Sequence, residues 1–291
     1  MLFVPGHKTR YIEAARRSCA DAIIFDLEDS VPPGEAVDAA RRSIAHAVIE
    51  GGWGPKHLYV RTSSLDAASF LADLRVAEHP DLSGIVLPKV SSGSEVRQLD
   101  VLLSGMERST GHERDPLAIF PLIETAAGVA QALDIASASG RVTGLVFGGE
   151  DYLADTGGRH DKDGLGLLFP RSIVLGAART VGILAIDTVF VRLGDSEGLA
   201  SHLSSSQMLG FDGMLAVHPD QLVAINTAYT PSSLEIARSR DILEASKNSI
   251  ASGNAVSQID GEFVGPPMVK AAERVVSRSD GISHHLSTEP S

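Results

Sequence analysis

Eight short apolar runs recur along most of the chain, and this rhythm constrains the fold more than any other feature of the sequence. The runs are Leu2–Val4, Ala22–Phe25, Leu58–Val60, Ile85–Leu87, Leu117–Ile123, Leu145–Phe147, Ile183–Ile186 and Met214–Val217. Each is continuous rather than alternating, as expected for parallel strands covered on both faces, and most are followed by a segment of helical period. Eight βα units in about 230 residues favour an α/β fold of the (β/α)8 TIM-barrel type over an open doubly wound sheet, which usually has five or six strands. A Rossmann-like sheet with extra helices is the alternative.

The composition changes after the eighth unit. We expect residues 1–230 to form the barrel catalytic domain and residues 231–276 to form a C-terminal helical extension, with a helix over Ser232–Ser246. The stretch 277–291 is polar and rich in serine, and it predicts a disordered tail.

Charge and cysteine content exclude several classes of function. The chain has 25 Lys and Arg against 37 Asp and Glu, a net charge of −12, and no local basic cluster. A surface of this sign repels phosphate backbones and anionic lipid, so we expect neither nucleic acid nor membrane as a partner. The single cysteine, Cys19, cannot form an intramolecular disulfide, and no apolar run reaches the ~20 residues of a bilayer helix. We therefore expect a cytoplasmic protein.

Chemically capable residues gather directly after the apolar runs, where a barrel places its active site. In chain order they are Pro5-Gly6-His7, Asp26, Glu28, Asp29, Arg61, Lys89, Glu124, Glu150, Asp151, Asp187 and His218. Any one carboxylate at such a position could simply cap the next helix. The coincidence across all eight units favours a single site.

Glu124 and Asp151 follow the fifth and sixth runs, so a barrel would bring these two carboxylates to neighbouring loops. One or two carboxylates, several waters and substrate oxygens are the usual ligands of Mg²⁺. Gly148-Gly149, just before Asp151, permits a close backbone approach. The pair predicts a Mg²⁺ site, with Mn²⁺ as the alternative metal and helix capping by Glu124 as the alternative role.

Arg61 lies where its guanidinium could reach a carboxylate or an enolate oxygen near that metal. Its alternative role is a structural ion pair with the acidic group Asp26, Glu28 and Asp29, and both roles are compatible. Nothing marks Lys89 as a desolvated Schiff-base lysine. His218 is more often a structural residue at such a position than a general base.

Eight segments in this order resemble the citrate lyase β-subunit-like branch of the HpcH/HpaI aldolase superfamily. They are LFVPGH (2–7), FDLEDSV (25–31), YVR (59–61), LPKV (87–90), PLIETAAGV (121–129), FGGEDY (147–152), AIDTVF (185–190) and GFDGMLAVHPDQ (210–221). The resemblance implies a Mg²⁺-dependent barrel enzyme that makes or breaks a C–C bond between an acyl-CoA enolate and a carbonyl compound, usually a 2-oxo acid. By position it implies Glu124 and Asp151 as metal ligands, Glu124 and Arg61 as substrate-binding residues, and Arg61, Glu28 and Asp29 as the catalytic group.

Two positions depart from the family's pattern. Gly265 stands where many malyl-CoA-type members carry an aspartate before a proline, so the general base is unassigned. Ala36 stands where a lysine is common after the DSV turn, which affects CoA binding or substrate choice if that lysine contacts CoA.

Three functional hypotheses follow. The leading one is a C–C lyase that cleaves a citramalyl-CoA- or malyl-CoA-type thioester to acetyl-CoA plus pyruvate or glyoxylate. The second is a metal-dependent pyruvate aldolase that does not use CoA, and the third is a non-catalytic assembly subunit. The resemblance also implies a homotrimer or a homohexamer, because family members often complete the site with a neighbour's C-terminal segment.

Overall fold

The computed structural model describes residues 1–110, 116–161, 164–251, 256–259 and 261–287. The chain divides into two compact units, Met1–Ile225 and Asn226–Ser291. The first unit ends a few residues before position 230, where the sequence predicts the end of the barrel domain.

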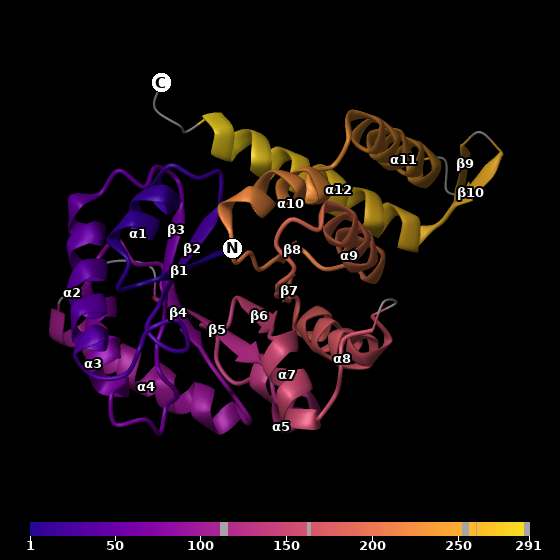
Figure 1. Ribbon diagram of the computed structural model, residues 1–291. Coiled ribbons are helices and arrows are strands. Elements are labelled where there is room, and N and C mark those ends of the chain that lie inside the picture. The colour runs from indigo at the N-terminus through magenta and orange to yellow at the C-terminus, as the bar shows by residue number, and fades with distance from the viewer. Residues whose placement is uncertain (111–115, 162–163, 252–255, 260, 288–291) are drawn as a thin grey trace. The chain divides into compact units, whose positions relative to one another are not determined.

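The first unit is built on an eight-stranded parallel sheet whose strands follow one another in chain order (Figure 1). The strands are β1 (Leu2–Pro5), β2 (Ala22–Asp26), β3 (His57–Arg61), β4 (Gly84–Leu87), β5 (Ala118–Ile123), β6 (Gly144–Phe147), β7 (Leu184–Asp187) and β8 (Gly213–Met214). An isolated parallel bridge pairs Leu2 of β1 with Ala216, just after β8, and the Phe3 amide donates to the Ala216 carbonyl at 2.9 Å. This curled sheet is consistent with a TIM-barrel-like fold. Sequential order differs from the doubly wound arrangement, in which the strand order reverses.

Helices separate the strands along the chain. They are α1 (Thr9–Arg16), α2 (Glu35–Glu50), α3 (Phe70–Leu74), α4 (Gly93–Thr110), α5 (Ala126–Ala130), α6 (Ala132–Ala136), α7 (Gly149–Thr156), α8 (Leu165–Val181), α9 (Ser196–Leu209) and α10 (Leu222–Tyr229), with 3-10 turns η1 (Arg75–Glu78) and η2 (Pro219–Gln221).

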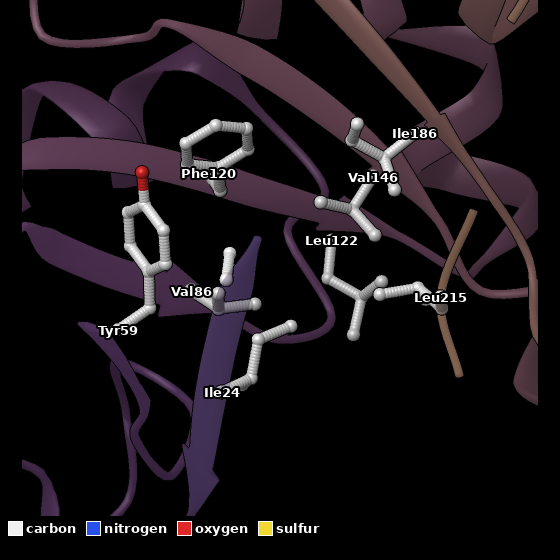
Figure 2. Packing of buried hydrophobic residues seen from close by; sticks show 9 residues of the cluster. Ile24, Tyr59, Val86, Phe120, Leu122, Val146, Ile186 and Leu215 are labelled. Carbon is white, nitrogen blue, oxygen red and sulfur yellow. The ribbon is translucent and has the colours of Figure 1, made fainter. Parts of the chain in front are cut away.

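One apolar cluster gathers side chains from successive strands (Figure 2). Its buried members are Ala22, Ile24, Tyr59, Val86, Phe120, Leu122, Val146, Ile186 and Leu215. Side chains alternate between the two faces of a strand, so the residue two positions after a cluster member lies on the same face. The positions that continue the cluster toward the carboxyl ends of the strands include Asp26, Arg61 and Glu124. The packing of the interior therefore aims these polar side chains at one end of the sheet.

The described part of the second unit includes the end of α10, two longer helices and a small hairpin. α11 (Ser233–Ala251) packs against α12 (Pro266–Ser287), and β9 (Ser257–Ile259) pairs antiparallel with β10 (Glu262–Val264). α12 runs through 277–287, part of the stretch for which the sequence predicts disorder, while 288–291 lie outside the described residues. Among the described residues, no helix combines the length and the apolarity that crossing a bilayer takes.

Candidate active site

Arg61 and Asp26 form a buried pair at the carboxyl ends of β2 and β3. The two residues are direct partners in the strand register, and only 7% of Arg61 and 1% of Asp26 is exposed. Arg61 Nε and Nη2 donate to Asp26 Oδ1 and Oδ2 at 2.6 and 2.7 Å. Burial opposes the ionised form of Asp26, yet the hydrogen bonds and charge of Arg61 hold its pKa below the usual range. The fork geometry fixes the guanidinium plane, as a bidentate contact does.

Glu28 and Asp29 extend this group from the loop after β2. Arg61 Nη1 donates to Asp29 Oδ2 at 3.1 Å and lies 3.1 Å from Glu28 Oε2. Burial, together with the charge of Asp29, raises the pKa of Glu28. Lys89 Nζ donates to Glu28 Oε1 at 2.7 Å, so the sequence-predicted acidic group shares two cations.

Lys89 also holds Glu124, through its main chain. Its φ of 54° makes it the one non-glycine residue of the described chain in the left-handed region, a strained conformation for a side chain with a Cβ. In this conformation the Lys89 amide donates to Glu124 Oε1 at 2.8 Å. Burial opposes protonation of the Lys89 amine, but its contacts with Glu28 and Asp29 raise its pKa above the ordinary value. A charged amine does not form a Schiff base.

Glu124 does not cap the helix that follows it. Thr125 caps α5, because its hydroxyl accepts from the Gly128 amide at 3.0 Å. The Glu124 carboxyl is 1% exposed. Burial, reinforced by the charge of Asp151, raises its pKa to about 8. The two carboxylates are therefore close enough to act on each other.

Asp151 lies in the first turn of α7, which begins at the Gly148-Gly149 turn. A Cβ added to Gly148 would lie 2.6 Å from both Cβ and Oε2 of Glu124. The group that lies close to the backbone of Gly148 is thus the Glu124 carboxylate. It brings the start of α7 against the second oxygen of Glu124, while Lys89 holds the first.

The donor set of this group suits a hard divalent cation. Five carboxylates (Asp26, Glu28, Asp29, Glu124 and Asp151) face two basic side chains, Arg61 and Lys89. In the described part of the chain, no cluster of three or more His, Cys, Asp or Glu side chains could enclose a metal by itself. A pair of carboxylates with open positions is what Mg²⁺ takes when waters and substrate oxygens complete its shell.

Two of the strand-end residues that the sequence singles out have structural roles elsewhere. Asp187 is fully buried, bound to Arg171 of α8 and to the Ser206 hydroxyl of α9 at 2.5 Å, because strand alternation turns it away from the face of Ile186. His218 caps η2, since its Nδ1 accepts from the Asp220 amide at 3.2 Å.

The sequence did not predict two of the groups that hold the candidate site in place. They are the main chain of Lys89 and the side chain of Thr188, whose hydroxyl accepts from the Gly149 amide at 2.8 Å. A left-handed lysine leaves no signal in one sequence. Thr188 offers a weak one, because it stands two residues after the predicted strand Ile183–Ile186.

A family model described as HpcH/HpaI aldolase/citrate lyase matches residues 1–219. The chain belongs to this family. Two curated members are a citrate lyase subunit beta from Leuconostoc mesenteroides subsp. cremoris, 34% identical over 98% of this chain and 94% of the relative, and an L-malyl-CoA/beta-methylmalyl-CoA lyase from Cereibacter sphaeroides, 32% identical over 97% and 94%. Both relatives are lyases by name.

A similar solved structure contains bound ligands. The protein CitE from Mycobacterium tuberculosis, in complex with magnesium, acetoacetate and coenzyme A, superposes with a TM-score of 0.74 at 29% identity, covering 96% of this chain and 97% of that one. Magnesium and coenzyme A are thus ligands of a close structural relative.

Proposed function

We propose that this protein is a Mg²⁺-dependent C–C lyase that cleaves a 3-hydroxyacyl-CoA acid of the citramalyl-CoA or malyl-CoA type. The products would be acetyl-CoA and a 2-oxo acid, pyruvate or glyoxylate. The observation that carries the proposal is the buried Glu124 carboxylate, held by the Lys89 amide on one oxygen and facing the start of α7 with the other. Membership of a family whose relatives are CoA-ester lyases supports the reaction class.

Glu124 and Asp151 would hold the metal in this proposal. When bound, Mg²⁺ would supply a Lewis acid for the oxygens of the 2-oxo acid portion and offset the excess of carboxylates. Mn²⁺ would serve the same donor set.

Arg61 would stabilise the negative charge that cleavage leaves behind. The substrate hydroxyl loses its proton, its C–O becomes the carbonyl of the 2-oxo acid, and the electron pair of the broken C–C bond passes to the thioester as an enolate. One proton added to the enolate carbon then gives acetyl-CoA, so the proton lost from the hydroxyl is balanced. Asp26 and Asp29 use three of the five N–H donors of Arg61, and Nη1 also lies 3.1 Å from Glu28 Oε2, so one N–H donor, on Nη2, remains for an enolate oxygen. Glu28 and Asp29 would keep the guanidinium oriented and charged. The base that takes the hydroxyl proton is unassigned.

The remaining architecture belongs to the same proposal. We propose that the sheet is a complete (β/α)8 barrel, closed by the Leu2 to Ala216 bridge. The second unit would be a C-terminal extension, and the assembly a homotrimer or homohexamer acting in the cytoplasm.

The test uses two conservative variants of the metal carboxylates. Glu124→Gln and Asp151→Asn should each lower Mg²⁺-dependent release of acetyl-CoA from the cleaved thioester by ~10²–10³ or more, since each removes an electrostatic partner of the reaction. Asp134→Asn is the matched control, because Asp134 accepts from Gly93 at the start of α4, outside the site. Wild-type rates in either site variant would remove the metal assignment.

A further inference from the structure

We propose that Thr188 is a positioning residue, which sets the place of Asp151 relative to Glu124 by anchoring the first amide of α7. This inference rests on the proposed function, because it concerns the same pair of metal carboxylates. It adds a residue from the seventh strand end, where the sequence singles out Asp187 and not Thr188.

The anchor is a buried hydrogen bond between distant parts of the chain. The Gly149 amide donates to Thr188 Oγ1 at 2.8 Å, and 1% of Thr188 is exposed. Gly149 is the first residue of α7, and Asp151 is the third. A hydroxyl that fixes the first amide of an eight-residue helix therefore fixes the carboxylate less than one turn later.

The Gly148-Gly149 turn is enclosed on both sides. A Cβ on Gly148 would lie 2.6 Å from Glu124 Oε2, and a Cβ on Gly149 would lie 2.9 Å from Thr188 Oγ1 and 3.1 Å from Leu167 Cδ1. The turn thus sits between one metal carboxylate and the Thr188 hydroxyl. Its position depends on what the hydroxyl holds, because the glycines have no side chains of their own to pack.

Thr188 is itself held by a rigid network behind the strand. Its amide donates to Asp187 Oδ1 at 2.9 Å, and Asp187 is bound by Arg171 of α8, with Arg171 Nε to Asp187 Oδ1 at 3.0 Å. Arg171 and Asp187 are both buried. The chain of contacts therefore runs from α8 through β7 to the start of α7 and the metal carboxylates.

Loss of the hydroxyl should loosen the site while leaving the fold intact. Thr188→Val keeps the shape and burial of the side chain but leaves the Gly149 amide without its acceptor. Residues that orient metal ligands typically contribute 10- to 100-fold in metal affinity. We expect Thr188→Val to weaken Mg²⁺ binding by ~10- to 100-fold, and Thr188→Ser, which keeps the oxygen, to restore it towards the wild-type value.

The experiment titrates the purified full chain with MgCl₂ in a calorimeter, without substrate, after circular dichroism has checked that each variant unfolds cooperatively in EDTA. Thr62→Val is the matched control: Thr62 is buried at the end of β3, and its hydroxyl has no partner within the described residues. It should bind Mg²⁺ as the wild type does. Thr188→Ser and Thr188→Ala form a second pair of variants, which differ from each other by one oxygen atom.

Three results for the Thr188 variants would overturn the proposal. Wild-type Mg²⁺ affinity in Thr188→Val shows that the hydroxyl does not position the site, and equally weak binding by the serine variant shows that the methyl group matters instead. Failure of both the valine and alanine variants to fold shows that the hydroxyl serves the fold. Glu124→Gln and Asp151→Asn in the same titration separate the two proposals. If both variants bind Mg²⁺ normally, the proposed function fails and this inference fails with it. If both lose Mg²⁺ binding while Thr188→Val keeps it, only the inference fails.

Discussion

Arg61 combines a structural and a chemical role in one side chain. Its contacts with Asp26 make it a buried ion pair, and its remaining donors face the carboxylates of the site. Breaking a buried pair by removing one partner typically costs ~3–5 kcal/mol. A loss of activity after truncation of Arg61 would therefore not distinguish unfolding of the protein from loss of the chemical role of the guanidinium.

Arg61→Lys separates the two roles, because lysine keeps a charge for Asp26 but loses the planar fork. We expect the rate of thioester cleavage to fall by ~10²–10³, while the protein still unfolds cooperatively on heating. Arg179→Lys is the matched control, since Arg179 pairs with Asp212 at 2.8 Å near the amino end of β7, the end opposite the candidate site. Cleavage by Arg61→Lys at the wild-type rate would exclude the guanidinium from the reaction.

At this scale the sequence predicted which side chains gather but not how they are held. Asp26, Arg61 and Glu124 were predictable because each directly follows or ends an apolar run. The Lys89 amide was not, because a φ of 54° in a lysine depends on the surrounding structure. Asp187 follows the same strand-end rule, yet one step of alternation turns it toward α8 and α9.

At the scale of elements, the close contact between β4 and β5 depends on a glycine. Gly84 pairs with Ala118, and a Cβ at position 84 would lie 2.1 Å from the Ala118 carbonyl oxygen, an atom of the main chain that cannot move aside cheaply. We expect Gly84→Ala to lower the free energy of unfolding by roughly 3 kcal/mol. Urea unfolding of the purified protein measures this change.

Gly176→Ala is the matched control on α8. Apart from the helix's own backbone, no atom of the described residues lies within 4 Å of a Cβ there, so alanine should raise the stability by about 0.5–1 kcal/mol through the helix backbone. Equal changes in the free energy of unfolding for Gly84→Ala and Gly176→Ala would contradict the close contact between β4 and β5.

His202 on α9 makes stability depend on pH. Burial lowers its pKa below the ordinary 6.5, and the charges of Arg171, Arg192 and His160 act the same way against the opposing charge of Asp187. Below about pH 6.5 the unfolded chain therefore binds a proton that the folded chain resists, so this contribution to stability is present above 6.5 and is lost as the pH falls. His202→Gln should flatten the fall in unfolding free energy over that window.

Urea unfolding at intervals between about pH 5 and pH 8 checks this slope. His46→Gln, at an exposed position on α2, is the matched control because it removes a histidine that is not buried. A variant at position 202 that loses stability as steeply as the wild type would show that other groups set the slope.

The sequence placed the eight strands well and the helix boundaries less well. Continuous apolar runs mark strands buried on both faces, which is why all eight coincide with β1 to β8 within a few residues. Ala126, Val129, Ala130, Leu133 and Ala136 are apolar at helical spacing and predict one helix, but the chain breaks at Gln131 into α5 and α6. Proline favours the first turn of a helix, so Pro170 in the sequence predicts a helix start, yet α8 begins five residues earlier, at Leu165, after Gly164 in the left-handed conformation.

At the scale of the whole molecule, the curled parallel sheet gathers residues from strands far apart in sequence at one end. Asp26, Arg61, Glu124 and Asp151 span more than a hundred residues, and only sequential strand order makes them neighbours. This is why family motifs spaced along the whole chain identify the reaction class, while no single segment does. The motifs do not name the substrate, and the chain departs from the family's pattern at Ala36 and Gly265.

The measurement that tests the account most directly is mass spectrometry of the purified protein incubated with citramalyl-CoA, malyl-CoA and citryl-CoA, each with Mg²⁺ or with EDTA. We predict release of acetyl-CoA from at least one thioester with Mg²⁺ and none with EDTA, and the accompanying 2-oxo acid names the substrate. Cleavage that persists undiminished in EDTA, or no cleavage of any of the three, would contradict the assignment of a Mg²⁺-dependent lyase of this substrate type.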